Sequence, residues 1–375
     1  MLVYWIIFGI LLYLSLRNYS YTNLVRRKYE NFCLIYFFLL FSLRSYCVGT
    51  DTMGYIIDFE NIYDVSYSYI WENMRDPIFY FCIKLLNNIC AYNIAIFIFI
   101  GLIFCFFVGY TLKRESDNFF LSLLIMMLFR YIDFPLSAMR NGIAIAIAFY
   151  ALSFLFQKKN FKFLLLVLIA SLFHKSLLIY CILYPLSLID FQKVNKLSIV
   201  VILFLFCISS QFLYSSLFVY MFLDQYSLYQ HDDTGASKLL TCLIVSFFYI
   251  LLLFNQPSKT EQTRKTNILF ICCSLSFIFS IMALINPSFA RISLFFGYAF
   301  TLAIPLIIRK MIQKMRYSLV SCCIIITSMF IYILGGPAPG VVPYSFFWSP
   351  KLNSTHTMEG ARVPYSKSDA LPVKL

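Results

Sequence analysis

The chain has 375 residues, of which 61% are hydrophobic and only 13% are charged. A soluble domain of this length could not bury so much apolar surface, so this composition excludes a soluble globular protein. The formal net charge is +13, but the basic residues fall in short segments between apolar runs. Membrane insertion explains that placement better than binding to nucleic acid does.

Apolar runs recur from residue 2 to residue 334, and a membrane-spanning helix needs about 20 apolar residues, or fewer where the bilayer is thin. The first run lacks a basic start and a small-residue cleavage site, so it is predicted to be a span rather than a removed signal peptide. Twelve spans are predicted in chain order, near residues 2–16, 31–46, 91–110, 119–133, 136–156, 161–173, 175–189, 197–218, 239–254, 268–286, 291–308 and 317–334.

The loops between these spans differ in charge. One alternating set holds 18 basic and 5 acidic residues, and the other set, with the tail, holds 11 basic and 12 acidic residues. Because basic loops stay in the cytoplasm, the first set is predicted to be cytoplasmic and both termini face outward. The basic set comprises 17–30, 111–118, 157–162, 190–196, 255–267 and 309–316; the other comprises 44–77, 130–140, 174–175, 219–238, 287–291 and 335–375.

Residues 161–189 are too few for two full spans. A single span there would place later basic loops outside, so two short or re-entrant helices that turn at His174 are predicted instead. Such hairpins are tolerated at membrane depth where they line a wet cavity. The predicted fold is an all-α integral membrane domain over residues 1–334 with larger outward-facing loops. An outward-facing, partly irregular tail follows over 335–375, starting at a Gly-Pro-rich segment.

The twelve cysteines are scattered, with no C-x-x-C pair, which favours buried thiols over a zinc site or a disulfide framework. Three arginines are predicted at the outer ends of spans. Arg140 and Arg291 fall in the first turn of inward-running helices, where backbone N–H groups and the helix dipole favour an anion, and Arg44 closes the second span. Forked guanidinium groups suit a diphosphate, although arginines at this depth also extend to lipid headgroups.

His174 is the one histidine predicted at membrane depth, where it would act as a general base, bind a sugar hydroxyl, or simply donate to a carbonyl. Asp51 follows Arg44 by seven residues and is a candidate base, sugar ligand or ion-pair partner. Asp232 and Asp233 alone give weak support for a metal site. No cofactor and no metal ligand are predicted, and no Gly-rich phosphate loop is found.

The chain resembles the EpsG family of bacterial exopolysaccharide proteins, which is allied to the Wzy O-antigen polymerases. The matching stretches are Arg44 to Tyr55, Met139-Arg140-Asn141-Gly142-Ile143-Ala144, Lys158-Lys159 to Phe163, Ala170 to Ser176, Ala290-Arg291-Ile292 and Val341 to Tyr344. In two places the sequence departs from the family pattern. Asn141 stands where the family usually has glutamine, and Asp76 where it often has glutamate.

The resemblance implies a GT-C-like fold and glycosyl transfer between undecaprenyl-diphosphate-linked oligosaccharides, at a site facing the periplasm or exterior of a bacterial cytoplasmic (inner) membrane. A chain-length regulator is expected by resemblance alone. Gly142 would let a phosphate approach the backbone. The predicted catalytic residues are Arg140, His174, Arg291 and Asp51, and the predicted substrate-binding residues are Arg44, Asn141, Thr50, Tyr55, Asp224 and Tyr226.

Two other functions fit the sequence less well. A flippase or transporter for the same lipid-linked sugar would need charges distributed through the membrane and related sequence halves, and neither is found. Another membrane transferase, either an acyltransferase using His174 or a metal-dependent GT-C enzyme using Asp51 and Asp232, is the remaining alternative. The sequence does not distinguish O-antigen, capsule or exopolysaccharide as the product.

Overall fold

The computed structural model describes residues 2–74, 76–189, 235–255, 263–284, 286, 288–312 and 344–348. These residues form helices joined by turns, and the one pairing of extended backbone among them is an antiparallel bridge between Arg44 and Phe346. The longer helices are α1 (Leu2–Arg17), α2 (Asn23–Ser42), α6 (Ile94–Glu115), α7 (Phe119–Leu128), α9 (Met139–Phe156), α10 (Asn160–Phe173), α14 (Gly235–Phe254), α15 (Arg264–Met282), α16 (Ser288–Gly297) and α17 (Phe300–Ile312).

The shorter elements are η1 (Asn18–Ser20), α3 (Thr52–Asn61), η2 (Ile62–Asp64), α4 (Tyr67–Asn73), α5 (Pro77–Ile89), α8 (Asp133–Ser137), η3 (Lys175–Ile182) and α11 (Leu183–Leu186). Three described helices, α6, α9 and α15, are long and apolar enough to cross a membrane. A fourth crossing results if α16 and α17 are one span broken by a 45° bend. Further apolar helices of 10–17 residues accompany them, as expected for a helical membrane protein.

Most predicted spans in the described residues coincide with helices, with differences that have local causes. The second helix starts earlier than predicted, because Thr22 caps it by accepting from the Val25 amide. Helix α7 ends at Leu128, before Arg130 with its positive φ of 57°. The span predicted at 291–308 is divided into α16 and α17. The predicted spans 197–218 and 317–334 lie outside the described residues, as does most of the tail, so the count of twelve stays a prediction.

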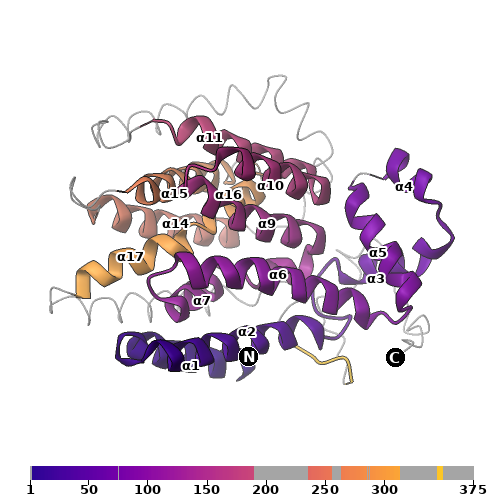
Figure 1. Ribbon diagram of the computed structural model, residues 1–375, viewed down its shortest axis with the longest axis horizontal. Coiled ribbons are helices and arrows are strands. Elements are labelled where there is room, and N and C mark those ends of the chain that lie inside the picture. Colours follow the sequence, from indigo (N-terminus) through magenta and orange to yellow (C-terminus); the bar gives the residue numbers. More distant parts are fainter. Residues whose placement is uncertain are drawn as a thin grey trace.

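The short helices near His174 agree with the sequence. Helix α10 ends at Phe173, His174 is extended, and η3 begins at Lys175. Helices α10 and η3 pack against each other, so the chain reverses at His174. Helix α10 also packs on α9, and α9 on α6 (Figure 1). The buried face of α9 is rich in alanine, which permits this close approach.

One end of the bundle is tied together by basic residues from loops that were predicted to share the cytoplasmic side. Lys265 lies 3.2 Å from Glu115, and Arg309 lies 3.6 Å from Asp117. Arg264 donates to the Leu155 carbonyl at 2.9 Å. The structure therefore confirms that these loops gather at a common end of the bundle.

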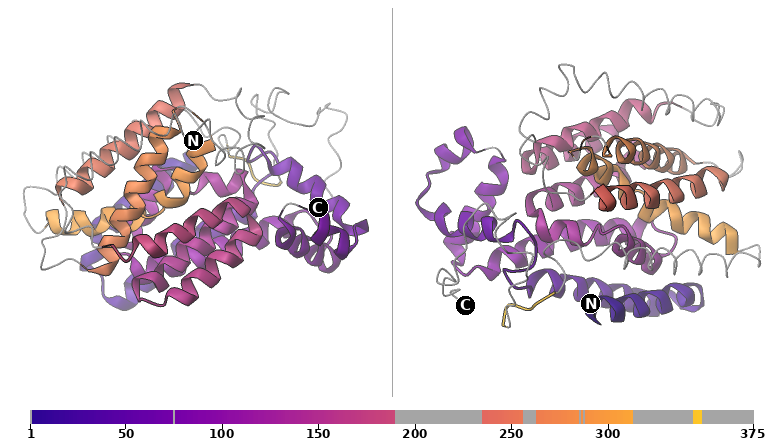
Figure 2. Two further views of the ribbon diagram at one scale, coloured as in Figure 1. Left: turned by 90° about the horizontal axis from the view of Figure 1, so that it is seen from above. Right: turned by 180° about the vertical axis from the view of Figure 1, so that it is seen from behind.

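The opposite end carries α3, α4 and α5, which Figures 1 and 2 show as a separate group beside the long helices. Helices α3 and α4 lie within the predicted loop 44–77, whereas α5 begins at its last residue and covers residues that were assigned to no span. Buried Lys84 of α5 donates to the carbonyls of Ile62, Tyr63 and Val65, where the helical segment α3–η2 ends. This charge stabilises the free carbonyls at a helix C-terminus. We refer to residues 52–89 as the cap.

Candidate active site

Asp76 lies at the centre of a cluster of charged side chains at the cap end of the bundle. It precedes α5, whose first residue is Pro77, and its side chain is only 1% exposed. Its Oδ2 atom accepts from Nη1 of Arg140 at 3.0 Å and lies 3.8 Å from Nδ1 of His174. One buried carboxylate therefore joins the cap to the start of α9 and to the turn after α10.

Arg140 is in the first turn of α9, as predicted. Its guanidinium carbon lies 5.6 Å from the ring centres of both Tyr55 and Tyr80, within cation–π range. The Tyr80 hydroxyl donates to Asp58 at 3.1 Å. The arginine side chain keeps 27% exposure, and its Nε makes no hydrogen bond within the described residues. Arg140 therefore has N–H groups, among them that of Nε, that are not used in its pairing with Asp76.

His174 is close to Arg291 as well as to Arg140. Its ring lies 6.3 Å from that of Phe295, and Phe295 is one helical turn after Arg291 on α16. Burial, together with the positive charges of Arg140 and Arg291, lowers the pKa of His174, and Asp76 opposes this shift only in part. His174 is therefore neutral near pH 7 and able to accept a proton.

The charge of Asp76 is maintained in spite of its burial. Burial by itself would raise the pKa of Asp76, but the interactions with His174, Arg140 and the backbone amide of Lys175 outweigh it, so the pKa lies below its ordinary value. The carboxylate is consequently ionised at neutral pH.

Arg44, predicted to bind substrate, is 1% exposed and has backbone partners. It donates to the carbonyls of Val48 and Leu136 and lies over the Phe97 ring at 4.6 Å. Leu136 is the penultimate residue of α8, three residues before α9 begins. Arg44 thus fixes the loop after α2 against the start of α9, which positions Arg140.

The other predicted residues occupy different surroundings. Thr50 and Asp51 are exposed before α3, with the Thr50 hydroxyl 3.3 Å from Asp51. Tyr55 is buried beside Arg140. Asn141 is buried at 3% exposure, and neither of its amide atoms has a hydrogen-bond partner within the described residues. Asp224 and Tyr226 lie outside the described residues, as do Asp232 and Asp233.

Gly142 has a packing explanation that the sequence did not reveal. A Cβ atom at this position would lie 2.5 Å from Cβ of Pro135, so α8 and α9 can approach each other only with glycine here. The expectation that Gly142 admits a phosphate is therefore not needed to explain the residue.

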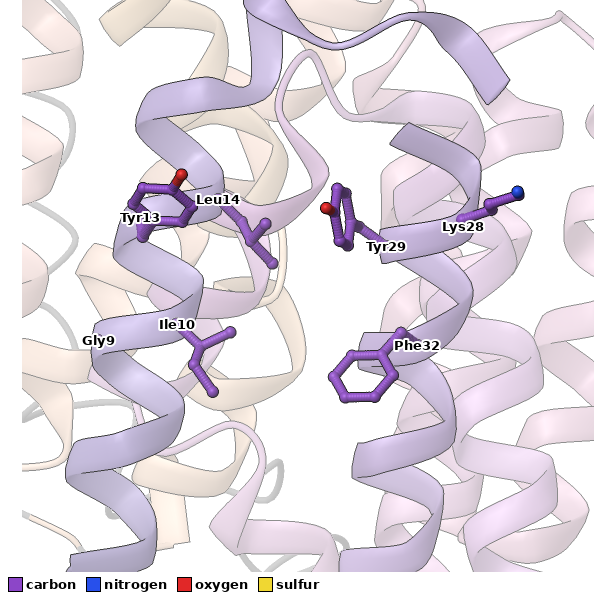
Figure 3. A pocket seen from close by; sticks show the side chains of 7 residues that line it. All are labelled: Gly9, Ile10, Tyr13, Leu14, Lys28, Tyr29 and Phe32. Carbon is purple, nitrogen blue, oxygen red and sulfur yellow. The ribbon is translucent and has the colours of Figure 1, made fainter. Parts of the chain in front are cut away.

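A cavity of about 580 Å³ lies between α1 and α2, lined by residues that include Ile10, Leu14, Tyr29 and Phe32. Figure 3 shows these apolar groups facing each other across the gap, whereas the amino group of Lys28 points away from it. The Asp76 cluster, which comprises Asp76, Arg140, His174 and Arg291, does not line this cavity. In the described part of the chain, no three His, Cys, Asp or Glu side chains gather in a way that could hold a metal ion.

Sequence reasoning did not place Asp76 or Tyr80 in the site. A signal for Asp76 exists, because Asp-Pro is a typical helix start. No sequence signal connects Asp76 with Arg140, 64 residues away.

The family model of the EpsG family matches residues 28–346, which include every residue of the Asp76 cluster. The chain belongs to the EpsG family. No match to a curated protein or to a solved structure is found. Membership and the apolar helices together identify a helical membrane protein of the polysaccharide-biosynthesis type, with glycosyltransferase-like activity associated with its family.

Proposed function

We propose that this EpsG-family protein is a polysaccharide repeat-unit polymerase. It transfers the growing glycan from undecaprenyl diphosphate to the non-reducing end of an incoming lipid-linked repeat unit. The observation that carries the proposal is the pairing of Arg140 and His174 with one buried carboxylate, Asp76, together with the charge of Arg291 acting on His174, where α9 and α16 begin.

The leaving group explains the arginines. As the bond from the anomeric carbon to phosphate oxygen breaks, negative charge concentrates on the lipid diphosphate. Fixed cations and helix N-termini stabilise that charge more in the transition state than in the ground state. Arg140 and Arg291 each lie in the first turn of a helix, so both supply a cation and a positive helix end.

The acceptor hydroxyl must lose a proton as its oxygen bonds to the anomeric carbon. His174 is the general base in this proposal, because it is neutral and adjacent to the arginines. The proton moves to the imidazole, and the electron pair of the broken bond leaves with the diphosphate. Asp51, exposed at the start of α3, is then an acceptor-sugar ligand, with Thr50, Tyr55 and Asn141 as further contacts.

The proposal includes a GT-C-like fold in a bacterial cytoplasmic membrane, with the Asp76 cluster facing the periplasm or exterior. The clustering of the basic loops at the opposite end supports this orientation. It is tested by labelling Thr50→Cys and Lys159→Cys, both at exposed positions, in a background without other reactive cysteines. An impermeant reagent added to whole cells should label position 50 and leave position 159 unlabelled; the reverse pattern refutes the orientation.

The activity is tested by glycan length on a gel. Arg140→Ala and Arg291→Ala should each leave single repeat units, with polymerisation reduced about 10²–10³-fold, the usual effect of removing one transition-state charge partner. Arg17→Ala, an exposed arginine on α1 away from the cluster, is the matched control and should give normal lengths. A flippase would instead lose all units outside the cell, and an acyltransferase would keep normal glycan lengths.

Metal-independence needs a separate measurement on the purified enzyme. The proposed mechanism expects unchanged activity after chelation. Activity that is abolished by a chelator and restored by Mg²⁺ or Mn²⁺ would replace it with a metal-dependent glycosyl transfer.

A further inference from the structure

Asp76 contacts two residues of the proposed mechanism, Arg140 and His174, but has no role in that mechanism as described above. It is buried at 1% exposure, accepts from Arg140 at 3.0 Å, and lies 3.8 Å from Nδ1 of His174. A buried carboxylate is costly unless it is paired, and here its partners are two groups of the proposed mechanism. This inference rests on the proposed function, which gives His174 the role of base.

The geometry determines which imidazole nitrogen is available. Nδ1 faces the Asp76 carboxylate, which favours the neutral tautomer with its proton on Nδ1. Nε2 then carries the lone pair, and it has no hydrogen-bond partner within the described residues. The 3.8 Å separation is longer than a hydrogen bond, and catalytic contacts of this kind often tighten only when substrate binds.

We propose that Asp76 is a positioning residue that holds His174 in the Nδ1–H tautomer and stabilises the imidazolium formed when Nε2 takes the acceptor proton. Arg140 keeps Asp76 in place through Nη1, and its remaining N–H groups stay available for the diphosphate. The same arginine therefore connects the leaving-group site with the orientation of the base. No proton is transferred to Asp76 in this step.

The first test is spectroscopic and leaves Asp76, Arg140 and His174 unchanged. The chain contains only three histidines, so ¹⁵N-histidine labelling gives three imidazole signals, and His231→Ala and His356→Ala identify that of His174. The expected result is a neutral ring protonated on Nδ1 at pH 7. A ring protonated on Nε2 overturns the proposal whether or not any Asp76 variant folds.

The second test compares Asp76→Asn with Asp58→Asn in a purified polymerisation assay. Asp58 is a carboxylate of the same cap that pairs with Tyr80 rather than with His174, so its variant is the matched control. Asp76→Asn should lower the rate about 10²-fold. The acid limb of its pH–rate profile should move to lower pH, because His174 then faces Arg140 and Arg291 without the opposing carboxylate. Asp76→Glu keeps the negative charge, so it should retain much of the wild-type activity, and the acid limb of its pH–rate profile should lie at the wild-type pH.

The outcomes separate this inference from the proposed function. If His174→Ala is inactive while Asp76→Asn keeps wild-type rate and profile, His174 remains the base and the positioning role is wrong. If His174→Ala polymerises normally, the proposed base is wrong as well. A rate loss in Asp76→Asn with an unshifted acid limb would indicate a purely structural carboxylate and would also overturn the inference.

Discussion

Replacing Arg140 by methionine should destabilise the protein, because Asp76 would remain buried without the one ion-pair partner that lies at hydrogen-bond distance among the described residues. Removing one member of a buried pair costs about 3–5 kcal/mol. The Arg140 side chain is 27% exposed, whereas Asp76 is 1% exposed. We therefore expect the lower figure, about 3 kcal/mol, for Arg140→Met. Asp76→Asn alone should cost less, about 1–2 kcal/mol, because the arginine can still reach solvent.

The double variant Arg140→Met with Asp76→Asn measures the coupling. Because the double variant leaves no unpaired charge buried, it should cost only about 1–2 kcal/mol, close to Asp76→Asn alone, and so be more stable than Arg140→Met. A coupling free energy of about 3 kcal/mol is expected, at the upper end of the range seen for residues in contact. The double variant should nevertheless fail to polymerise, which separates loss of catalysis from loss of folding.

The assay is reversible unfolding of the purified protein in detergent micelles, followed by tryptophan fluorescence and circular dichroism. The cost of Arg140→Met should also shrink as the pH falls, since the unpaired Asp76 takes up a proton. Strict additivity of the two single variants, or an unchanged unfolding free energy for Arg140→Met, would show that the pair does not form in the folded protein.

Three further predictions concern the cap and the loop before it. Lys84→Met should cost about 2 kcal/mol, because three carbonyls lose a charged donor, and should speed hydrogen exchange over residues 52–73; unchanged exchange would contradict this contact. Gly49→Ala should cost roughly 1–3 kcal/mol, since φ is +99° and a Cβ atom would collide with the Leu136 carbonyl oxygen. Gly54→Ala, inside α3 with open space around it, should instead stabilise the protein by up to about 1 kcal/mol in the same unfolding assay. Burial raises the pKa of Asp58 in spite of its neighbours Tyr80 and Arg140, so its stabilising contribution is present below the ordinary pKa and is lost as the pH rises through the folded-state value. Asp58→Asn should therefore melt above the wild type at pH 7 and match it in acid.

The sequence predicted the long helices and the position of the two key side chains because these depend on local patterns. Arg140 and His174 both lie where an apolar run begins or ends, and the charge difference between loops placed them at a common end. The position of Arg291 in the first turn of a helix was likewise predicted from the local helix-start signal before it. These parts of the site needed no knowledge of long-range packing.

The cap could not be predicted in the same way. Helices α3, α4 and α5 are 10, 7 and 13 residues long, all shorter than the roughly 20 apolar residues that a membrane span needs, so a search for spans does not find them. The pairing of Asp76 with Arg140 arises only when the cap docks on α9, so it is tertiary information. The packing of Gly142 on Pro135 likewise depends on the angle between α8 and α9.

The short segment 344–348 has a consequence for biosynthesis. Its backbone pairs with residues 43–45: Ser45 donates to the Ser345 carbonyl and Phe347 donates to that of Leu43, both near 3.0 Å. The Tyr344 hydroxyl reaches the Leu40 carbonyl. Residues beside Arg44 must therefore wait, during translation, until residues 344–348 have left the ribosome. A message truncated shortly before codon 344 would encode Asp76, Arg140, His174 and Arg291 yet yield a protein in which residues 43–45 lack these partners.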